Sequence, residues 1–405
     1  MPNTYPKTAL VINCGSTSVK FAIMDPSDGH VFLSGLADAL GQPEAELSWK
    51  YDGGDKEKAA IANADHAAAL EYLVANVLSA NPQLKASIVA CGHRIVHGGE
   101  YYSHPTLVND EVVANIEKCI PFAPLHNPAH ILGINAARAS FPDIPHVTVF
   151  DTAFHQTMPP VAYRFAIPTQ YYRDLGVRRY GAHGTSHLYL TQRAAALLGR
   201  EVSEVNLVTC HLGGGASVSA VRNGQCADTS MGLTPLDGLV MATRTGSIDP
   251  SVAFFMCLKL GISAQEAAEI FNKKSGLLGV SGVSPDMRVV ETEAEKGNAD
   301  CKLALELFNY RLARFIASYI GILGHVDAIV FSGGIGENSP RTRQETVAIL
   351  HEAFGIVLDE RLNACMAARG DKGGLISAQD SRIKVFMIPT NEELMIARSA
   401  FEFVK

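Results

Sequence analysis

The sequence lacks the signals that would direct a chain into a membrane or out of the cell. No apolar run reaches the roughly 18 residues needed to cross a bilayer, and the N-terminal residues have no apolar segment typical of a signal peptide. The eight cysteines are scattered, and none lies within three residues of another, so CxxC redox and zinc motifs are absent. We therefore expect a cytoplasmic protein with buried, reduced thiols and no membrane partner.

Several common enzyme signatures are missing as well. There is no GxxxxGK[ST] loop, no GxGxxG after a first strand and no GxSxG. These absences argue against a P-loop enzyme, a Rossmann dehydrogenase and an α/β-hydrolase, respectively. The formal net charge of −7 argues against a general nucleic-acid partner.

The composition of the chain is that of a folded protein with more than one domain. Its 405 residues are 47% hydrophobic and 19% charged, and domains typically hold about 100–200 residues. Strand-like and helix-like segments alternate almost throughout, which indicates an α/β protein. No low-complexity linker marks a domain boundary.

A short pattern occurs twice, about two hundred residues apart. GSTSV, from Gly15 to Val19, aligns without a gap on GGASV, from Gly214 to Val218. Each copy predicts a hairpin with a glycine-rich turn. The predicted strands are residues 7–13 and 18–24 in the first copy, and residues 206–212 and 217–222 in the second. The repeat suggests two α/β units with a break near residue 150.

The second half of the chain has further predicted elements. Apolar residues at spacings of three and four predict a helix over 303–323, and an apolar run predicts a strand over 326–334. Ser339 is a plausible N-cap of the next helix, with proline following it. In the last helix, Thr390 and Glu393 fit a capping box.

Three glycine-rich turns, CGSTS, HLGGGAS and SGGIGEN, could bind phosphate. Glycine lets backbone N–H groups approach an anion without an obstructing Cβ. Lys20 shares a strand face with Ser18, next to the first turn, and could reach a phosphate as a cation. The alternative is a solvated lysine on an edge strand. Together the three turns favour a nucleotide ligand.

Histidine spacing offers a weaker alternative. His93/His97, His126/His130 and His183/His187 are HxxxH pairs, a spacing that can bind zinc on a helix. Their surroundings are rich in glycine and proline, and none contains HExxH. A zinc hydrolase is therefore the weakest of the hypotheses.

Longer motifs suggest a family. INCGSTSVK, GHRIVHGG, FAPLHNPAH, FDTAFHQT, RRYGAHGTSH, DTSMGLTPLDGL, SGGIGEN and IPTNEEL occur in this order from about residue 8 to the C-terminus. Together they resemble the acetokinase family of acetate and propionate kinases, within the superfamily of actin, sugar kinases and heat-shock ATPases.

The resemblance implies a fold and an assembly. It implies two ribonuclease-H-like, actin-like ATPase domains with mixed sheets and an interdomain nucleotide cleft. The N-terminal domain would comprise residues 1–151 and 389–405, and the C-terminal domain residues 152–388. The family resemblance also implies a homodimer formed through the second domain.

The resemblance further implies which residues act. Metal ligands would be Asn13 and Glu392, holding Mg²⁺ or alternatively Mn²⁺, whose preferred ligands are oxygens. Residues facing the phosphates would be Ser16, Ser18 and Lys20. Substrate contacts would be Arg94 to the carboxylate, and Val96, Leu125 and Pro235 to the acyl methyl. The transferring phosphoryl group would be surrounded by Asp151, His183 and Arg244. Nucleotide contacts would be His211, Leu212, Gly213, Gly214, Gly215, Asp286, Met287, Arg288, Gly334, Ile335, Gly336, Glu337 and Asn338.

The implied reaction is the reversible transfer of the ATP γ-phosphoryl group to acetate, giving acetyl phosphate and ADP. Propionate is the alternative substrate, and a non-catalytic actin-like ATP switch is the alternative from another class. Two motifs depart from the family pattern. The familiar HLGNG has Gly214 in place of asparagine, and the familiar TRSGDIDP has Ser247 in place of an acidic residue.

Overall fold

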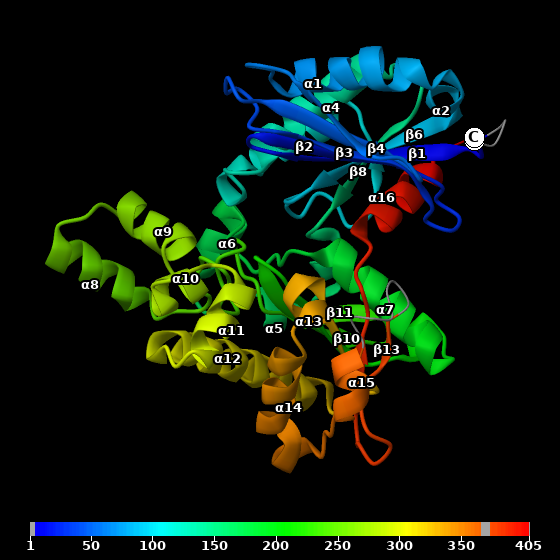
Figure 1. Ribbon diagram of the computed structural model, residues 1–405. Coiled ribbons are helices and arrows are strands. Elements are labelled where there is room, and N and C mark those ends of the chain that lie inside the picture. The colour runs from blue at the N-terminus through cyan, green and yellow to red at the C-terminus, as the bar shows by residue number, and fades with distance from the viewer. Residues whose placement is uncertain (1–4, 366–372, 405) are drawn as a thin grey trace. The chain divides into compact units, whose positions relative to one another are not determined.

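The computed structural model describes residues 5–365 and 373–404 (Figure 1). Its contacts define two compact units: unit 1 is residues 1–153 with 391–405, and unit 2 is residues 154–390. The domain bounds expected from the sequence, with breaks at 151 and 389, remain a proposal about where independently folding domains end.

Unit 1 is built on a mixed sheet with the strand order β5-β4-β3-β2-β1-β6-β8-β7. Its strands are β1 (Thr8–Gly15), β2 (Ser18–Met24), β3 (Val31–Asp38), β4 (Glu46–Tyr51), β5 (Lys56–Ala60), β6 (Ile88–Ile95), β7 (Thr106–Leu107) and β8 (His146–Phe150). The β1–β6 and β6–β8 pairs are parallel, and the other pairs are antiparallel.

Helices cover both faces of this sheet, as Figure 1 shows. The helices of unit 1 are α1 (His66–Tyr72), α2 (Pro82–Ser87), α3 (Asp110–Lys118), α4 (Asn127–Ser140) and α16 (Glu392–Phe401). Leu10 and Ile12 of β1 pack in the core cluster that includes α1 and α4, whereas Ala9 and Val11 pack against α16. This alternation follows from the two-residue period of a strand that is buried on both faces.

Unit 2 has a second mixed sheet with the order β11-β10-β9-β12-β14-β13. Its strands are β9 (Leu207–Leu212), β10 (Ala216–Arg222), β11 (Gln225–Thr229), β12 (Ala328–Ser332), β13 (Gly374–Leu375) and β14 (Lys384–Met387). Its helices are α5 (Pro160–Tyr163), α6 (Thr169–Leu175), α7 (Gly184–Leu198), α8 (Pro250–Leu260), α9 (Ala264–Lys273), α10 (Gly276–Ser281), α11 (Met287–Glu295), α12 (Ala299–Leu323), α13 (Gly333–Asn338), α14 (Pro340–Phe354) and α15 (Glu360–Cys365).

The central strands of the two sheets are arranged in the same way, and both predicted hairpins are confirmed. In unit 1, β1 pairs with β2 antiparallel and with β6 parallel. In unit 2, β9 pairs in the same way with β10 and β12. The repeated sequence pattern therefore marks the same turn of two similarly ordered sheets.

Other predictions from the sequence need adjustment at element ends. The predicted 303–323 helix is α12, which begins earlier because the Asn298 side chain caps it. The predicted 326–334 strand ends at Ser332, since Gly333 takes a left-handed φ of 75° and begins α13. Ser339 is confirmed as the N-cap of α14, where its hydroxyl accepts a hydrogen bond from the Thr342 N–H.

The predicted capping box of the last helix is wrong. Asn391, rather than Thr390, is the N-cap of α16, and its side chain accepts a hydrogen bond from the Leu394 N–H at 3.0 Å. The Thr390 hydroxyl instead bonds Ser186.

All eight cysteines are unpaired thiols. Six are buried, but Cys257 is partly exposed and Cys365 is exposed, so the expectation that all are buried is wrong for these two. No helix of the described residues combines the length and apolar character that a membrane span requires.

Candidate functional site

A buried ion pair dominates the candidate site of unit 1. Arg94 lies near the end of β6, and Asp151 follows the last residue of the neighbouring parallel strand β8. Nε and Nη2 of Arg94 donate to the two carboxylate oxygens of Asp151 at 3.1 and 2.7 Å. Asp151 is 1% exposed, and its charge is the main cause that raises the pKa of Arg94.

A pocket of about 350 Å³ surrounds Arg94 within unit 1. Its lining is Asn13, Cys14, Gly15, Ser18, Lys20, Leu36, Arg94, Val96, His126 and His130. Strand register explains part of this grouping, because Asn13 pairs with Lys20 and Gly15 with Ser18 across the β1–β2 hairpin. The structure therefore brings together five residues from three of the predicted roles: Asn13, Ser18, Lys20, Arg94 and Val96.

The N-terminus of α16 adds carboxylates to this region. Oε1 of Glu392 is buried and has no hydrogen-bond partner among the described residues. Burial raises the pKa of Glu392, whereas the nearby charge of Arg94 opposes that rise. Lys20 forms an ion pair with Glu393 at 2.7 Å and keeps 59% of its side chain exposed. Since β2 lies between β1 and β3, Lys20 is not an edge-strand lysine.

Two histidines of this pocket, His126 and His130, have no predicted role. They belong to the HNPAH segment at the start of α4, and the sequence presented them only as a possible zinc pair. Burial, followed by the charge of Arg94, lowers the pKa of His130 to about 3, so its imidazole is neutral. A neutral histidine beside an arginine can bond a ligand without adding charge to the pocket.

Unit 2 contains a pocket of about 690 Å³ that gathers most of the predicted nucleotide residues. Its lining is Gly213, Gly214, Ala242, Pro285, Asp286, Met287, Arg288, Glu291, Gly334, Ile335, Asn338 and Ser339. Ala242, Pro285, Glu291 and Ser339 carry no motif that would have marked them in the sequence. Glu291 is tied to the N-cap of α14, because the Ser339 hydroxyl donates to its carboxylate at 2.5 Å.

Some predicted nucleotide residues form hydrogen bonds within the protein. Nε and Nη2 of Arg288 donate to the carboxylate of Asp286 at 3.1 and 2.6 Å, in an exposed pair. Oε1 of Glu337 accepts the Gly333 N–H at 2.9 Å and the Thr390 N–H at 3.1 Å. Glu337 thus holds the glycine turn and is absent from the pocket lining, as are His211, Leu212, Gly215 and Gly336.

A chain of hydrogen-bonding side chains supports His183. His183 has a left-handed φ of 58° immediately before α7, and its Nδ1 lies 2.9 Å from the Ser217 hydroxyl. That hydroxyl also lies 2.8 Å from Nε2 of His187, whose Nδ1 lies 2.7 Å from the Thr209 hydroxyl. Burial lowers the pKa of His187 well below its ordinary value, so this histidine is neutral. The chain therefore fixes the orientation of the His183 ring.

Arg244 and His183 both lie beside the second glycine turn. A Cβ added to Gly215 would come within 3.3 Å of His183 Nε2 and 3.7 Å of Arg244 Nη1. The same Nη1 donates to the Pro235 carbonyl at 3.1 Å, and burial lowers the pKa of Arg244. An imidazole and a guanidinium thus face a turn of backbone amides, an arrangement suited to phosphate oxygens.

Further predicted residues that line neither pocket are Ser16, Leu125 and Pro235. Ser16 is exposed at the tip of the first hairpin, and Leu125 is 58% exposed. Neither lines a pocket described above. Pro235 belongs to unit 2, whereas Val96 and Leu125 belong to unit 1.

The two departures from the family pattern have different surroundings. A Cβ added at Gly214 would have no heavy atom within 4 Å, so the site has room for the familiar asparagine. Ser247 donates to Asp237 Oδ1 at 2.6 Å and accepts from the Gly238 N–H at 3.1 Å. Ser247 therefore braces the loop before Arg244 in place of an acidic side chain.

The zinc hypothesis gains no support from the histidine pairs. His93 is on a strand, and His97 follows that strand. His183 lies just outside the helix that contains His187. Across residues 5–365 and 373–404, none of the three pairs contributes both members to a group of potential metal ligands.

Comparison with known proteins identifies relatives along nearly the whole chain. Residues 8–398 match the family described as the Acetokinase family. The chain is 52% identical to an acetate kinase of Serratia proteamaculans and 50% identical to one of Proteus mirabilis. Each alignment covers 97% of this chain and 98% of the relative.

Solved structures agree with these matches. The crystal structure of an acetate kinase from Porphyromonas gingivalis superposes with a TM-score of 0.93 at 41% identity, covering 98% of this chain and 100% of that one. A propionate kinase from Francisella tularensis gives a TM-score of 0.91 at 42% identity, covering 98% and 99%. The predicted fold class, of two actin-like ATPase domains with mixed sheets, agrees with these matches.

Proposed function

Because this chain belongs to the acetokinase family, we propose that it is an acetate kinase that transfers the γ-phosphoryl group of ATP reversibly to acetate. The observation that carries the proposal is the buried Arg94–Asp151 pair at the wall of a small pocket. ATP and ADP are the co-substrates of the family's reaction. The products are acetyl phosphate and ADP.

Arg94 is suited to hold the acetate carboxylate. A guanidinium has five N–H donors, and the bond to Asp151 engages only Nε and Nη2. Asp151 keeps Arg94 charged and fixes its plane, so the remaining N–H groups are pre-oriented for a second carboxylate. Val96, which is 6% exposed in the same pocket, supplies an apolar contact for the methyl group. For Leu125 and Pro235, contact with the acyl methyl rests on the family resemblance alone.

We propose that the nucleotide binds in the pocket of unit 2. Its lining combines Gly213 and Gly214 with the start of α13 and the Asp286–Arg288 segment. Backbone amides of the glycine turn would hold phosphates, and the wider part of the pocket would hold the adenosine. His183 and Arg244 beside Gly215 then neutralise charge on the transferring phosphoryl group.

The reaction needs no general base. A carboxylic acid with an ordinary pKa of about 4–5 is already ionised at neutral pH, so acetate can attack directly. Asp151 therefore acts by positioning Arg94, which its two hydrogen bonds support. We expect direct in-line transfer without a phosphoenzyme, and inversion of configuration at a chiral phosphoryl group is the corresponding stereochemical outcome.

The residues near α16 fit Mg²⁺. The buried Oε1 of Glu392 has no hydrogen-bond partner among the described residues. Burial raises the pKa of this carboxyl group, and a bound cation would stabilise its charged form. Asn13 offers an amide oxygen from the pocket wall, and Mg²⁺ or Mn²⁺ favours such oxygen ligands. When bound, the metal would screen the charge of the phosphate oxygens.

Replacing Glu392 tests this metal site. Glu392→Gln keeps the size of the side chain but removes its negative charge, so the Mg²⁺ concentration for half-maximal activity should rise by about tenfold or more. Activity titrations with Mg²⁺ and Mn²⁺ measure the change. Glu393→Gln is the matched control, because Glu393 pairs with Lys20 instead. An unchanged metal requirement in Glu392→Gln would contradict the assignment.

Propionate is the second candidate substrate, supported by the similarity to a propionate kinase structure. The two acids differ by one methylene, and a hydrophobic pocket distinguishes one methylene by only about 1–3 kcal/mol. Ala182, adjacent to His183, is small and buried, so it does not favour acetate over propionate by its size. Hydroxamate trapping of the acyl phosphate with acetate, propionate and butyrate gives the order of kcat/KM.

Arg94→Ala tests the carboxylate site and separates the kinase from an ATP-driven switch. We expect acyl phosphate formation to fall by about a hundredfold or more, because a charge-assisted contact and its buried partner Asp151 are both affected. Nucleotide binding, measured by calorimetry, should persist. Arg138→Ala, on the exposed surface of α4, is the matched control and should keep full activity.

Two outcomes would count against the assignment. Loss of nucleotide binding in Arg94→Ala would mean that this arginine does not serve the acid. The non-catalytic switch would be favoured if the rate of ATP hydrolysis did not change on addition of any short-chain acid and Arg94→Ala hydrolysed ATP as fast as the wild type.

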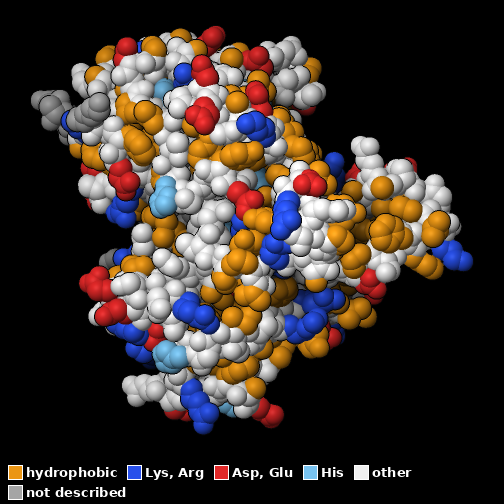
Figure 2. Space-filling model, turned by 180° about the vertical axis from the view of Figure 1, so that it is seen from behind, with side chains coloured by type: hydrophobic (Ala, Val, Ile, Leu, Met, Phe, Trp, Pro, Cys, Tyr) orange, Lys and Arg blue, Asp and Glu red, His pale blue; other side chains and the backbone are white. Residues whose placement is uncertain are grey.

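An exposed apolar helix supports a homodimer. Figure 2 shows hydrophobic side chains over the α8–α9 region, at the right of the view. No residue of α8 is buried, and Phe254, Phe255 and Leu258 are 68%, 61% and 86% exposed. Contiguous apolar patches on a surface usually mark an interface. We propose that α8 packs against a second copy of the chain. We also propose that the enzyme is cytoplasmic and that its cysteines remain reduced.

Sedimentation equilibrium tests the homodimer. Leu258→Asp should shift the protein from dimer to monomer, because it places a charge in the middle of the apolar face. Val161→Asp, at an 89% exposed position of α5, is the matched control and should leave the dimer intact. A wild-type protein that sediments as a monomer would refute the proposal.

A further inference from the structure

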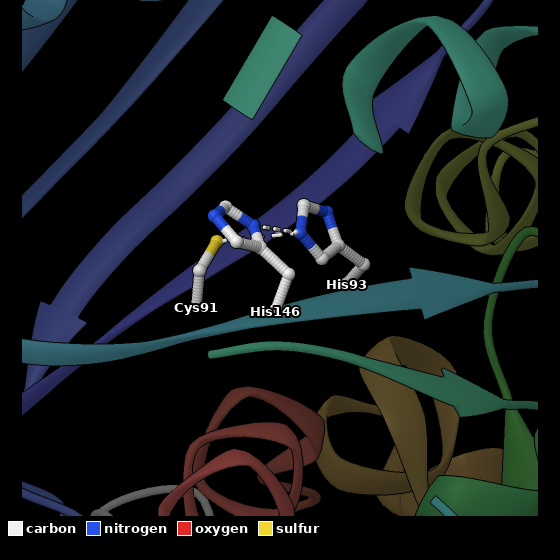
Figure 3. A group of neighbouring side chains, drawn as sticks. All are labelled: Cys91, His93 and His146. Carbon is white, nitrogen blue, oxygen red and sulfur yellow. Dashed lines mark hydrogen bonds between the residues drawn. The ribbon is translucent and has the colours of Figure 1, made fainter. Parts of the chain in front are cut away.

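Three potential metal ligands meet inside unit 1, and none of them is among the residues assigned to the kinase reaction. Figure 3 shows Cys91 and His93 of β6 beside His146 of β8. Nε2 of His93 lies 3.0 Å from Nδ1 of His146 and 3.4 Å from Sγ of Cys91. Within residues 5–365 and 373–404, this is the one group of three such side chains whose ligand atoms all lie within 4.8 Å of one another.

These spacings suit one shared cation. Metal–sulfur and metal–nitrogen bonds of about 2.3 and 2.0 Å place neighbouring ligand atoms about 3.3–3.7 Å apart. The observed separations of 3.0 and 3.4 Å need to widen by only a few tenths of an ångström. Strand pairing keeps the group in place, because Cys91 lies directly opposite His146 in the parallel register and His93 follows two residues later.

The protein already orients one of the ligands. Nε2 of His146 donates to the Phe141 carbonyl at 2.9 Å, so in the neutral ring Nδ1 carries the lone pair that faces the group. A backbone carbonyl in this position is the usual outer-shell partner of a metal-binding histidine. Because His146 Nδ1 carries a lone pair, Nε2 of His93 donates the proton of the hydrogen bond between them.

Burial limits the charge that the group can hold. Cys91 is 0%, His93 2% and His146 6% exposed. Histidine binds a metal through its neutral ring, and cysteine binds it as a thiolate. One thiolate and two neutral imidazoles bring a single negative charge. A monovalent cation gives a neutral complex, whereas Zn²⁺ would leave an uncompensated positive charge in an apolar interior, at a considerable cost.

We propose that Cys91, His93 and His146 form a three-coordinate site for a soft monovalent metal cation, with Cu(I) as the representative ion. Thiolate and imidazole ligands suit both copper and zinc, and the single negative charge of this ligand set favours the monovalent Cu(I) over Zn²⁺. Binding releases the Cys91 thiol proton, and the His93 proton moves from Nε2 to Nδ1. The two strands that carry Arg94 and precede Asp151 are thereby joined from the opposite face of the sheet.

The surface offers a route to this group. His146 lines a pocket of about 530 Å³ together with Leu107, Val108, Arg138, Ala139, Pro142, Ile144 and Pro145. The pocket gives access to His146, whereas Cys91 and His93 are not part of its lining. Arg138 lines the same pocket, and its positive charge disfavours a divalent ion more than a monovalent one.

Competition for Cu(I) tests the proposal on the full-length protein. Under anaerobic, reducing conditions, the chain should withdraw one equivalent of Cu(I) from a chromophoric chelator such as bicinchoninate. Cys91→Ala and His146→Asn should each weaken binding by more than the roughly 10–100-fold that loss of an outer-shell partner costs. Cys365→Ser, which removes the exposed thiol, is the matched control and should bind as the wild type does.

The fold of each variant is checked by circular dichroism and by its acetate kinase activity in the absence of copper. That activity should be unchanged, because Cys91 and His146 have no assigned role in the kinase reaction. If Cys91→Ala fails to fold, His146→Asn decides. The proposal is overturned if the wild type withdraws no copper, if Cys365→Ser abolishes binding, or if the Cys91 and His146 variants still bind one equivalent as tightly. Tighter binding of Zn²⁺ than of Cu(I) at this site would overturn the charge argument.

Discussion

The ion pair between Arg94 and Asp151 is the interaction on which the candidate site of unit 1 depends. A carboxylate that is 1% exposed is costly to bury, and two hydrogen bonds from a guanidinium compensate it. Parallel pairing of β6 and β8 brings the two residues together, although 57 positions separate them in the chain. The same pairing aims Arg94 into a pocket with Asn13, Lys20 and Val96. The fold thus offsets the cost of the buried carboxylate and holds a charged Arg94 in a fixed position at the pocket wall.

The repeated topology explains why each unit presents a glycine-rich turn. In both sheets a hairpin is followed by a parallel strand on its other side, so the turn emerges at the same end of the central strand. Different side chains then specialise the two turns. Lys20 and Arg94 accompany the first, whereas His183 and Arg244 flank the second. A duplicated arrangement of backbone amides is therefore combined with a different set of side chains in each unit.

The sequence predicted both hairpins and the residue types around each turn, because glycine clusters and strand periodicity are local signals. It did not predict the Asn391 cap or the role of Glu337, which depend on contacts between segments far apart in the chain. Glu291 and Ala242 lie in the larger pocket through tertiary packing alone, so no motif marks them. The Cys91–His93–His146 group was also missed, since His146 comes from a separate strand and lacks motif spacing. The family resemblance, by contrast, named both Arg94 and Asp151 as site residues without showing that they bond to each other.

A double-mutant cycle on Arg94 and Asp151 tests the central claim most directly. It compares kcat/KM for acetate in Arg94→Lys, Asp151→Asn and the double variant. If Asp151 acts by holding Arg94, the two losses should be strongly non-additive, with a coupling energy of about 2–3 kcal/mol, near the upper end for groups in one buried network. Additive losses, within about 0.5 kcal/mol, would show that the two residues act independently and would contradict the account.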